Sequence, residues 1–105
     1  MDPITADLKK AMIKIRFFGS IRVAAKKDSD DLDFISDITV FGLLRKISDI
    51  YGEDLHSELF DVSEVLRDDL MITLNEAIVN HKNAATIKLN PGDVVALLPT
   101  FPGGG

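Results

Sequence analysis

Three consecutive glycines near the end of the chain are the residues whose type and position could do chemistry. Residues 99–105 have the sequence PTFPGGG. The two prolines lack a backbone donor and hold φ near −65°, so we expect this segment to leave the fold as an extended arm. Without a Cβ, Gly103, Gly104 and Gly105 make an end thin enough to carry the terminal carboxylate into a narrow channel. The competing explanation is a frayed end or an expression remnant.

Two histidines and a pair of aspartates are weaker candidates for chemistry. His56 and His81 stand far apart and lack the short spacing of metal ligands, so no metal site is expected. Both histidines are predicted to face solvent or to lie in loops. Asp68 and Asp69 are adjacent, which is more typical of a solvated turn than of an acid–base pair.

Composition bounds the class of protein. The 105 residues, of which 46% are apolar and 28% charged, suit one globular domain. A net charge of −5 opposes a phosphate backbone, so nucleic-acid binding is not expected. No cysteine is available for disulfides, metal thiolates or nucleophilic catalysis. No apolar run approaches the ~20 residues of a membrane span and no signal peptide opens the chain, which predicts a cytoplasmic protein without membrane contact.

The first part of the chain predicts two strands joined by a loop. Residues 1–11 are polar and mixed, and we interpret them as an N-terminal extension. In residues 13–17 apolar side chains alternate with charged ones, which is the period of a half-buried strand. Gly19 and Ser20 interrupt this strand, residues 26–30 are typical of a hairpin loop, and the alternation in residues 31–34 indicates a returning strand.

The next segment predicts the main helix. Thr39 can cap its N-terminus, and Ile38 and Leu43 have the spacing of a hydrophobic staple. Gly42 indicates close packing in the first turns, and Gly52 predicts a left-handed cap at the end. The apolar stripe at helical spacing comprises Val40, Leu43, Leu44, Ile47, Ile50 and Tyr51.

The last part predicts a second helix and three strands. Asp61 and Glu64 have the spacing of a capping box, which predicts a short helix over residues 61–66. Two strands then fit residues 71–74 and 77–79, joined by a tight turn. Asn90-Pro91-Gly92-Asp93 places Pro and Gly as a type II turn requires. It leads into residues 94–98, an unbroken apolar run that predicts a central strand buried on both faces.

Three segments and the final glycines together resemble one known family. The segments are MIKIRFFGSIR at 12–22, MITLNEAIV at 71–79 and NPGDVVALLP at 90–99. In this order they are similar to the small subunits of molybdopterin synthase, which are ubiquitin-like sulfur carriers of the MoaD/ThiS type. The resemblance covers residues 12–105. It implies an α+β, ubiquitin-like β-grasp fold, with a mixed sheet of about four to five strands on one main helix. The domain would span residues 12–99, and a flexible tail residues 100–105.

The same resemblance implies a carrier rather than an enzyme, with catalysis residing in its partners. In this family an E1-like enzyme uses ATP to adenylate the terminal glycine, here Gly105, and a sulfur donor converts it to a thiocarboxylate. As the small subunit of molybdopterin synthase, the carrier then delivers sulfur inside the large subunit to cyclic pyranopterin monophosphate. Gly103 and Gly104 would lie in the same narrow channel, and no cofactor would be bound to the carrier itself.

Such a carrier must bind its partners through the folded domain, because ordering a glycine arm costs backbone entropy. The sheet face near the tail is the expected docking surface, with Phe18, Leu97, Pro99 and Phe101 as candidate contacts. Core packing explains Phe18 and Leu97 equally well, whereas docking is the favoured role of Phe101.

The end of the chain departs from the family pattern. Thr100 occupies a position where a second proline is usual, and Gly105 extends the usual glycine pair by one residue. Several alternatives therefore stay open. They are a ubiquitin-like modifier conjugated to lysines, a sulfur carrier for thiamine synthesis or tRNA thiolation, and an interaction module whose tail is inert.

Overall fold

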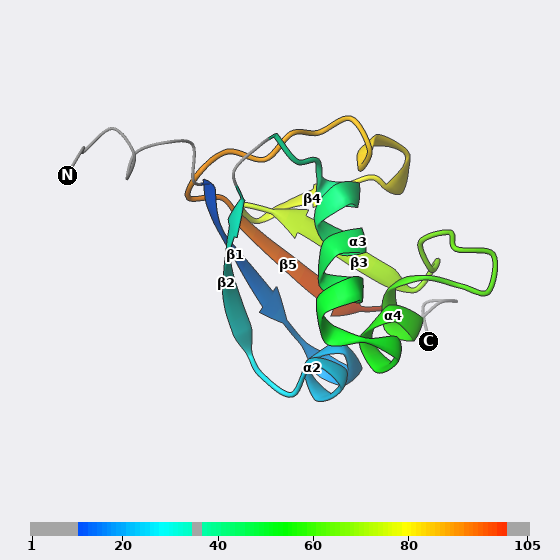
Figure 1. The fold of residues 1–105 in the computed structure, drawn as a ribbon. Helices are drawn as coiled ribbons and strands as arrows, with labels where there is room; N and C mark the ends of the chain where they lie inside the picture. Colours follow the sequence, from blue (N-terminus) through cyan, green and yellow to red (C-terminus); the bar gives the residue numbers. More distant parts are fainter. Residues whose placement is uncertain (1–10, 35–36, 101–105) are drawn as a thin grey trace.

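The computed structural model describes residues 11–34 and 37–100, which form one mixed β-sheet packed against helices. The sheet has five strands in the order β2-β1-β5-β3-β4 (Figure 1). Their bounds are β1 Ala11–Phe17, β2 Ser29–Phe34, β3 Leu70–Leu74, β4 Ala77–Val79 and β5 Val94–Pro99. β1 and β5 are parallel, and the other neighbouring strands are antiparallel. This arrangement confirms the predicted α+β class and its mixed sheet.

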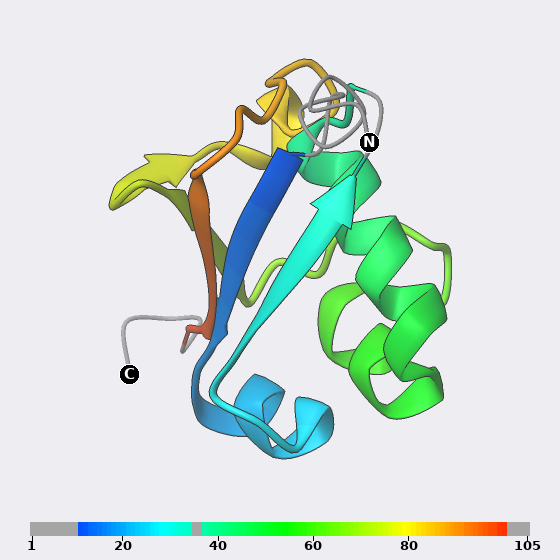
Figure 2. The same ribbon diagram turned by 60° about the vertical axis from the view of Figure 1, so that its left-hand side comes forward.

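The helices gather on one face of this sheet (Figure 2). They are α2 Gly19–Ala25, α3 Val40–Tyr51, α4 Glu53–Leu59 and the 3-10 helix η1 His81–Asn83. α3 is the longest and lies across the sheet, while α2 and α4 pack at the end of the sheet where β1 finishes. None of the helices in the described part of the chain has the length and apolarity needed to cross a membrane.

The main helix, α3, forms where its capping signal and apolar period predicted it. The Thr39 side chain accepts a hydrogen bond of 3.0 Å from the Gly42 backbone N–H, which satisfies one donor of the first turn. Four apolar residues of its first two turns are fully buried: Val40, Leu43, Leu44 and Ile47. Ile50 was expected in the same stripe, but its side chain is 55% exposed. In that last turn Ser48 faces inward instead, where it bonds with His56 of α4.

Two short helices differ from the prediction. Gly19 was expected to end the first strand in a loop, but it begins α2, whose Ile21 and Ala25 are buried one turn apart. The helix predicted at residues 61–66 is wrong, because α4 lies earlier, over Glu53–Leu59. Residues 61–66 form a tight turn in which the Asp61 N–H donates to the Val65 carbonyl. Glu64 in this turn has φ of +64°, which a right-handed helix does not allow.

The two predicted turns are confirmed, and the central strand is corrected. Asn75 and Glu76 both have positive φ, as a mirror-image hairpin turn between β3 and β4 requires. The turn before β5 has Gly92 at φ +90° and closes with a hydrogen bond of 3.0 Å from the Asp93 N–H to the Asn90 carbonyl. β5 is not buried on both faces. Its alternate residues are half-buried, because helices cover only one side of the sheet.

Candidate functional site

The chain leaves the sheet at the end of β5, between β3 and the start of α2. Pro99 pairs with Leu70 in the register of β5 and β3. The pairing continues one residue further, since the Thr100 N–H donates a hydrogen bond of 2.7 Å to the Asp69 carbonyl. Thr100 is the last residue that the structure describes. The start of the C-terminal tail is therefore fixed by the sheet.

Gly19 bounds the same exit on the other side. It has φ of +57°, and a Cβ on it would come within 2.6 Å of the Pro99 Cγ. The neighbouring backbone is joined to β5 as well, because the Phe18 N–H donates to the Leu97 carbonyl at 3.2 Å. Only a residue without a side chain allows Pro99 to lie this close to the first turn of α2.

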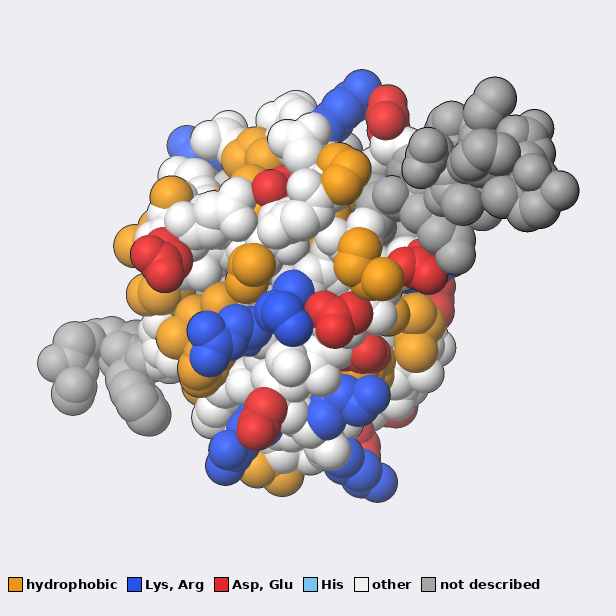
Figure 3. All heavy atoms as spheres, turned by 90° about the vertical axis from the view of Figure 1, so that its left-hand side faces the viewer, with side chains coloured by type: hydrophobic (Ala, Val, Ile, Leu, Met, Phe, Trp, Pro, Cys, Tyr) orange, Lys and Arg blue, Asp and Glu red, His pale blue; other side chains and the backbone are white. Residues whose placement is uncertain are grey.

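The face of the sheet opposite the helices is open to solvent. Cross-strand pairing aligns one row of side chains on this face, made by Ser29, Arg16, Ala96, Thr73 and Ile78. The Ile78 side chain is 72% exposed, although it is large and apolar. Figure 3 shows hydrophobic side chains beside a group of lysine and arginine side chains on this side of the molecule. We call this surface the open face.

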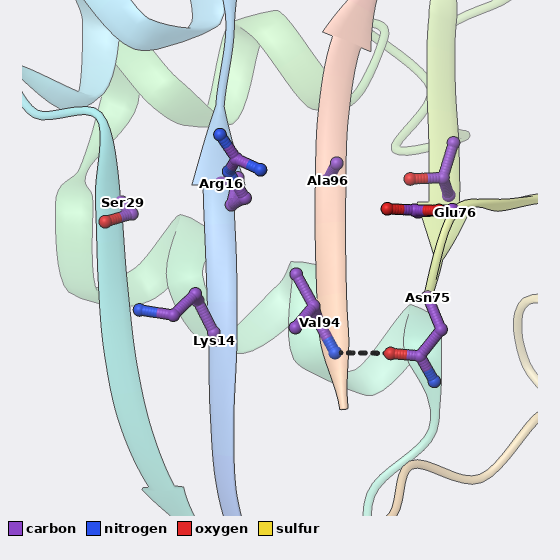
Figure 4. Close-up of a pocket in the computed structure, with 8 residues that line it drawn as sticks. Lys14, Arg16, Ser29, Asn75, Glu76, Val94 and Ala96 are labelled. Carbon is purple, nitrogen blue, oxygen red and sulfur yellow. Dashed lines mark hydrogen bonds between the residues drawn. The ribbon is translucent and has the colours of Figure 1, made fainter. Parts of the chain in front are cut away.

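The twist of the sheet hollows the open face into a shallow groove of about 600 Å³. Its lining side chains come from β1, β2, β3, β5 and the turn between β3 and β4, and Figure 4 labels all of them except that of Thr73 on β3. They are Lys14, Arg16, Ser29, Thr73, Asn75, Glu76, Val94 and Ala96. The side chain of Asn75 is held in place because its Oδ1 accepts a hydrogen bond of 2.9 Å from the Val94 N–H. Lys14 is paired with Asp31 at 3.1 Å.

Arg16 is the cation of this groove whose charge is not matched by a carboxylate within the described residues. Its guanidinium carbon lies 5.3 Å from the centre of the Phe18 ring instead. Phe18 is half-buried, at the point where β1 passes into α2. The pair presents an aromatic surface and a positive charge side by side, which is a combination common at protein interfaces.

The structure separates the predicted site residues into three groups. Leu97 was a candidate docking contact for which core packing was an equal explanation, and its side chain is fully buried, so it belongs to the core. Phe18 and Pro99 lie half-buried at the end of β1 and of β5, next to the exit of the tail. Phe101 and Gly103–Gly105 lie outside the described residues.

His56 is not solvent-facing as predicted, because it joins α3, α4 and the turn at residues 61–66. Its Nδ1 bonds with the Ser48 hydroxyl, and its Nε2 lies 3.0 Å from the Glu64 carboxylate. Its ring stacks on Phe60 with centroids 5.0 Å apart. The hydrogen bond between the His56 Nε2 and the Glu64 carboxylate, followed by one from Arg45, holds the pKa of Glu64 below its usual range. Ser48 is buried in α3, so this Ser–His–Glu set is a structural network rather than a nucleophile.

His81 and Asp69 make their contacts near the exit of the tail. The His81 Nε2 lies 2.8 Å from the Leu70 carbonyl. Asp69 forms a two-bond ion pair with Arg67, whose Nε and Nη2 each donate at 2.9 Å. The guanidinium holds the pKa of the Asp69 carboxyl below its usual range, first through these hydrogen bonds. Within residues 11–34 and 37–100, no group of three or more candidate ligands could hold a metal ion.

Sequence reasoning missed three residues at the exit. Gly19 was noted only as an interruption of a strand, although its position before the apolar Ile21 and Ala25 could have indicated a helix start. Asp69 contributes its backbone carbonyl, which accepts from the Thr100 N–H, and Arg67 pairs with the Asp69 carboxylate. No sequence pattern signals either of these contacts.

Comparisons with known proteins identify the family and the fold. A model of the ThiS family matches residues 15–104. SAMP1 from Haloferax volcanii is 21% identical with a TM-score of 0.76, over 90% of this chain and 100% of that one. Urm1 from Trypanosoma brucei is 24% identical with a TM-score of 0.69, over 90% of this chain and 97% of that one.

A further solved structure contains a protein of this type with a partner. It is a complex of subunits 1 and 2 of the molybdopterin-converting factor from Helicobacter pylori. The matched chain is 26% identical with a TM-score of 0.55, over 89% of this chain and 99% of that one. No curated protein sequence matches the chain. The family match spans nearly all of the described domain, and the solved structures share its ubiquitin-like β-grasp fold, so the chain belongs to the ThiS family of ubiquitin-like sulfur carriers.

Proposed function

We propose that this chain is the sulfur-carrying small subunit of a molybdopterin synthase. The carboxylate of Gly105 is adenylated by an E1-like enzyme with ATP and receives sulfur as a thiocarboxylate. It then donates this sulfur to cyclic pyranopterin monophosphate within a large subunit. Small proteins of the ThiS/MoaD type are carriers and not catalysts, so the bond-making groups belong to the partners.

The observation that carries the proposal is the way in which β5 ends. The strand lies in the middle of the sheet, and Thr100 is still hydrogen-bonded to the strand beside it. Residues 101–105 can extend by at most about 18 Å beyond this point. A partner that binds the carboxylate of Gly105 must therefore lie against the domain itself.

The proposed chemistry asks little of this chain beyond a free C-terminus. A terminal carboxylate has a pKa of about 3.5 and is an unreactive anion at neutral pH. Its oxygen attacks the α-phosphorus of ATP and pyrophosphate leaves, which yields an acyl adenylate. A sulfur nucleophile then attacks the carbonyl carbon and AMP leaves. Glycine at the end admits both steps in a narrow site because no Cβ crowds the carbonyl.

The open face is the surface we assign to the partners. Ordering the six residues from Thr100 to Gly105 would cost about 6–12 kcal/mol of backbone entropy if all were free. The glycines offer no side chains to offset this cost, so contacts of the domain must supply the free energy. Ile78, Phe18 and Arg16 provide exposed apolar area and a positive charge for this purpose.

Deletion of Gly105 tests the proposal. We expect it to abolish sulfur loading while the melting temperature stays unchanged, because the terminal carboxylate, now that of Gly104, reaches up to about 3.5 Å less far into the adenylating site and the sheet is untouched. Intact mass after incubation with an adenylating enzyme, ATP and a sulfur source reports loading as one oxygen-to-sulfur exchange. Conversion of cyclic pyranopterin monophosphate by the loaded chain and a large subunit then identifies the pathway. An unchanged mass of the full chain with enzymes that load a known carrier would overturn the proposal.

A second candidate function is conjugation to lysines. SAMP1, a small archaeal modifier protein, aligns at a higher TM-score than the molybdopterin-converting factor chain does. The discriminating measurement is a ladder of conjugates in cells that depends on the last two glycines. Conjugates together with absent sulfur transfer to cyclic pyranopterin monophosphate would favour the modifier.

A further inference from the structure

We propose that Arg67 is a positioning residue for the C-terminal tail. The residue is distant from the terminal carboxylate along the chain and acts through Asp69, which holds Thr100 at the exit. The structural part of this inference stands on its own. Its consequence for sulfur loading rests on the proposed function.

Arg67 lies between two elements, α4 and β3. Its backbone N–H donates to the Leu59 carbonyl at the end of α4 at 2.9 Å, and its carbonyl accepts from the Leu70 N–H at 3.1 Å. One guanidinium nitrogen also reaches the Ser57 carbonyl at 3.4 Å. Arg67 therefore joins the end of α4 to the first residue of β3.

The carboxylate of Asp69 is held in a fixed orientation by Arg67. Both of its carboxylate oxygens accept from Arg67 at 2.9 Å, which is the planar two-bond pairing that only arginine provides. A single hydrogen bond would allow the carboxylate to rotate, whereas the two parallel bonds restrain it. The restraint passes to the Asp69 peptide group, whose carbonyl receives the Thr100 N–H at 2.7 Å.

The contact with Asp69 depends on the backbone N–H of Thr100. A proline at this position would have no N–H, and the Asp69 carbonyl would lose its partner. Threonine keeps the donor, so pairing with β3 extends past the last residue of β5. Gly19 closes the opposite side, because Pro99 lies directly over the place where its Cβ would be. The tail starts in a restrained direction as a result.

The consequence is that fewer residues remain to be ordered by a partner. Any freedom in the direction of Thr100 is carried along the tail to Gly105. If the Asp69 contact opens, the partner must order one more backbone residue, which corresponds to a roughly fivefold to thirtyfold loss of apparent affinity. Because this loss applies equally before and during the reaction, it raises KM and leaves kcat unchanged.

The experiment compares Arg67→Ala with Arg45→Ala in the full chain. Arg45 is a matched control, since it also pairs with a carboxylate of the same segment, Glu64 at 2.9 Å, and is similarly exposed. Amide exchange of Thr100, followed by NMR, should accelerate about fivefold to thirtyfold in Arg67→Ala and stay within about twofold in Arg45→Ala. Equal protection of Thr100 in both variants would overturn the inference. If Arg67→Ala fails to fold, Arg67→Lys keeps the charge, loses the two-bond geometry and should give the same effect in smaller measure.

Loading kinetics separate positioning from direct contact with a partner. With the adenylating enzyme and ATP, Arg67→Ala should raise KM about fivefold to thirtyfold and keep kcat within about twofold. In a Thr100→Pro background the donor is already gone, so Arg67→Ala should add nothing. An equal rise of KM in that background would show that Arg67 contacts the enzyme, and the inference would be wrong. Failure of the unaltered chain to load would instead count against the proposed function, while the Thr100 exchange result would still decide the inference.

Discussion

The two faces of the sheet carry residues of the same strands but differ in what covers them. On the helix-covered face, Ile13, Ile15, Val95 and Leu97 are all fully buried. On the open face, the residues between them are charged, small or half-exposed, and Ile78 is largely in solvent. Successive residues of a strand point to opposite faces, so one strand contributes to stability with one set and to recognition with the other.

This difference predicts which substitutions change the stability of the domain and which change the binding of a partner. Burial on the helix-covered face supplies the apolar transfer free energy that holds the fold together. Among the described residues no helix covers the open face, and its groove lies on the same sheet as the exit of the tail. A substitution on the open face can thus change partner binding while the fold stays stable, and a substitution on the helix-covered face can change stability while the partner surface stays intact.

The matched pair Leu97→Ala and Leu98→Ala tests this division most strongly. Leu97 is fully buried, whereas its neighbour Leu98 is half-buried on the open face. We expect Leu97→Ala to lower the free energy of unfolding by about 2–5 kcal/mol, because it leaves a cavity in the core between β5 and the helices. Leu98→Ala should cost about 1 kcal/mol or less and should weaken partner binding instead. Urea unfolding measures the first effect and titration with a purified partner the second.

The comparison would be wrong if the two leucines gave equal losses of stability. It would also be weakened if Leu98→Ala left partner binding unchanged while the chain remained folded. In that case the partner surface would have to be sought away from the open face.

The main elements were predictable because strong, repeated signals specify them. The main helix has a capping Thr39 and a continuous apolar stripe, and the turn at Asn75-Glu76 joins two alternating segments. The two short helices carry weaker signals. α4 has its two buried residues, Leu55 and Leu59, within a polar segment, so its apolar period was too short to stand out.

The candidate site was predictable only in part, for a physical reason. The tail and the nearby sheet face follow from residue types, because glycine and proline constrain the backbone locally. For Leu97 docking and core packing stayed equally open, because an unbroken apolar run does not tell which of its residues meets helices and which meets solvent. The contact between Asp69 and Thr100 joins two backbone groups, and backbone groups are the same for every residue type.

A second and smaller test concerns the packing at the exit of the tail. It compares Gly19, which faces the last residue of β5, with Gly92, which lies just before β5 begins. Gly19 and Gly92 both have positive φ, so alanine should cost about 1–2 kcal/mol at each from backbone strain. Gly19 also faces Pro99, whereas nothing lies within 4 Å of a Cβ at Gly92. Gly19→Ala should therefore be less stable than Gly92→Ala by about 1–3 kcal/mol, the usual cost of overpacking. Thermal unfolding of both variants checks this difference, and equal melting temperatures would show that Pro99 moves aside freely.

Tyr51 gives the smallest effect, and its phenolic hydroxyl lies at the edge of the helix-covered face. Its ring meets Phe17 edge-on with centroids 5.5 Å apart, and its hydroxyl donates to the Asp30 carboxylate. Burial, followed by this hydrogen bond and the charge of Asp30, raises the pKa of Tyr51 well above its usual value. The hydroxyl thus keeps its proton in the folded chain at a pH where it is lost from the unfolded chain.

The sign of the pH dependence follows from that difference. The stabilisation is fully present below the unfolded pKa of about 10 and declines as the pH rises toward the folded pKa, by at most about 1.4 kcal/mol per pH unit. Tyr51→Phe should remove this decline, while costing about 0.5–1.5 kcal/mol at neutral pH. Because Tyr51 is the single tyrosine of the chain, absorbance of its phenolate reports the titration directly. A midpoint near 10 in the folded protein would mean that Asp30 does not hold the hydroxyl, and that this edge of the covered face is as open to solvent as the opposite side of the sheet.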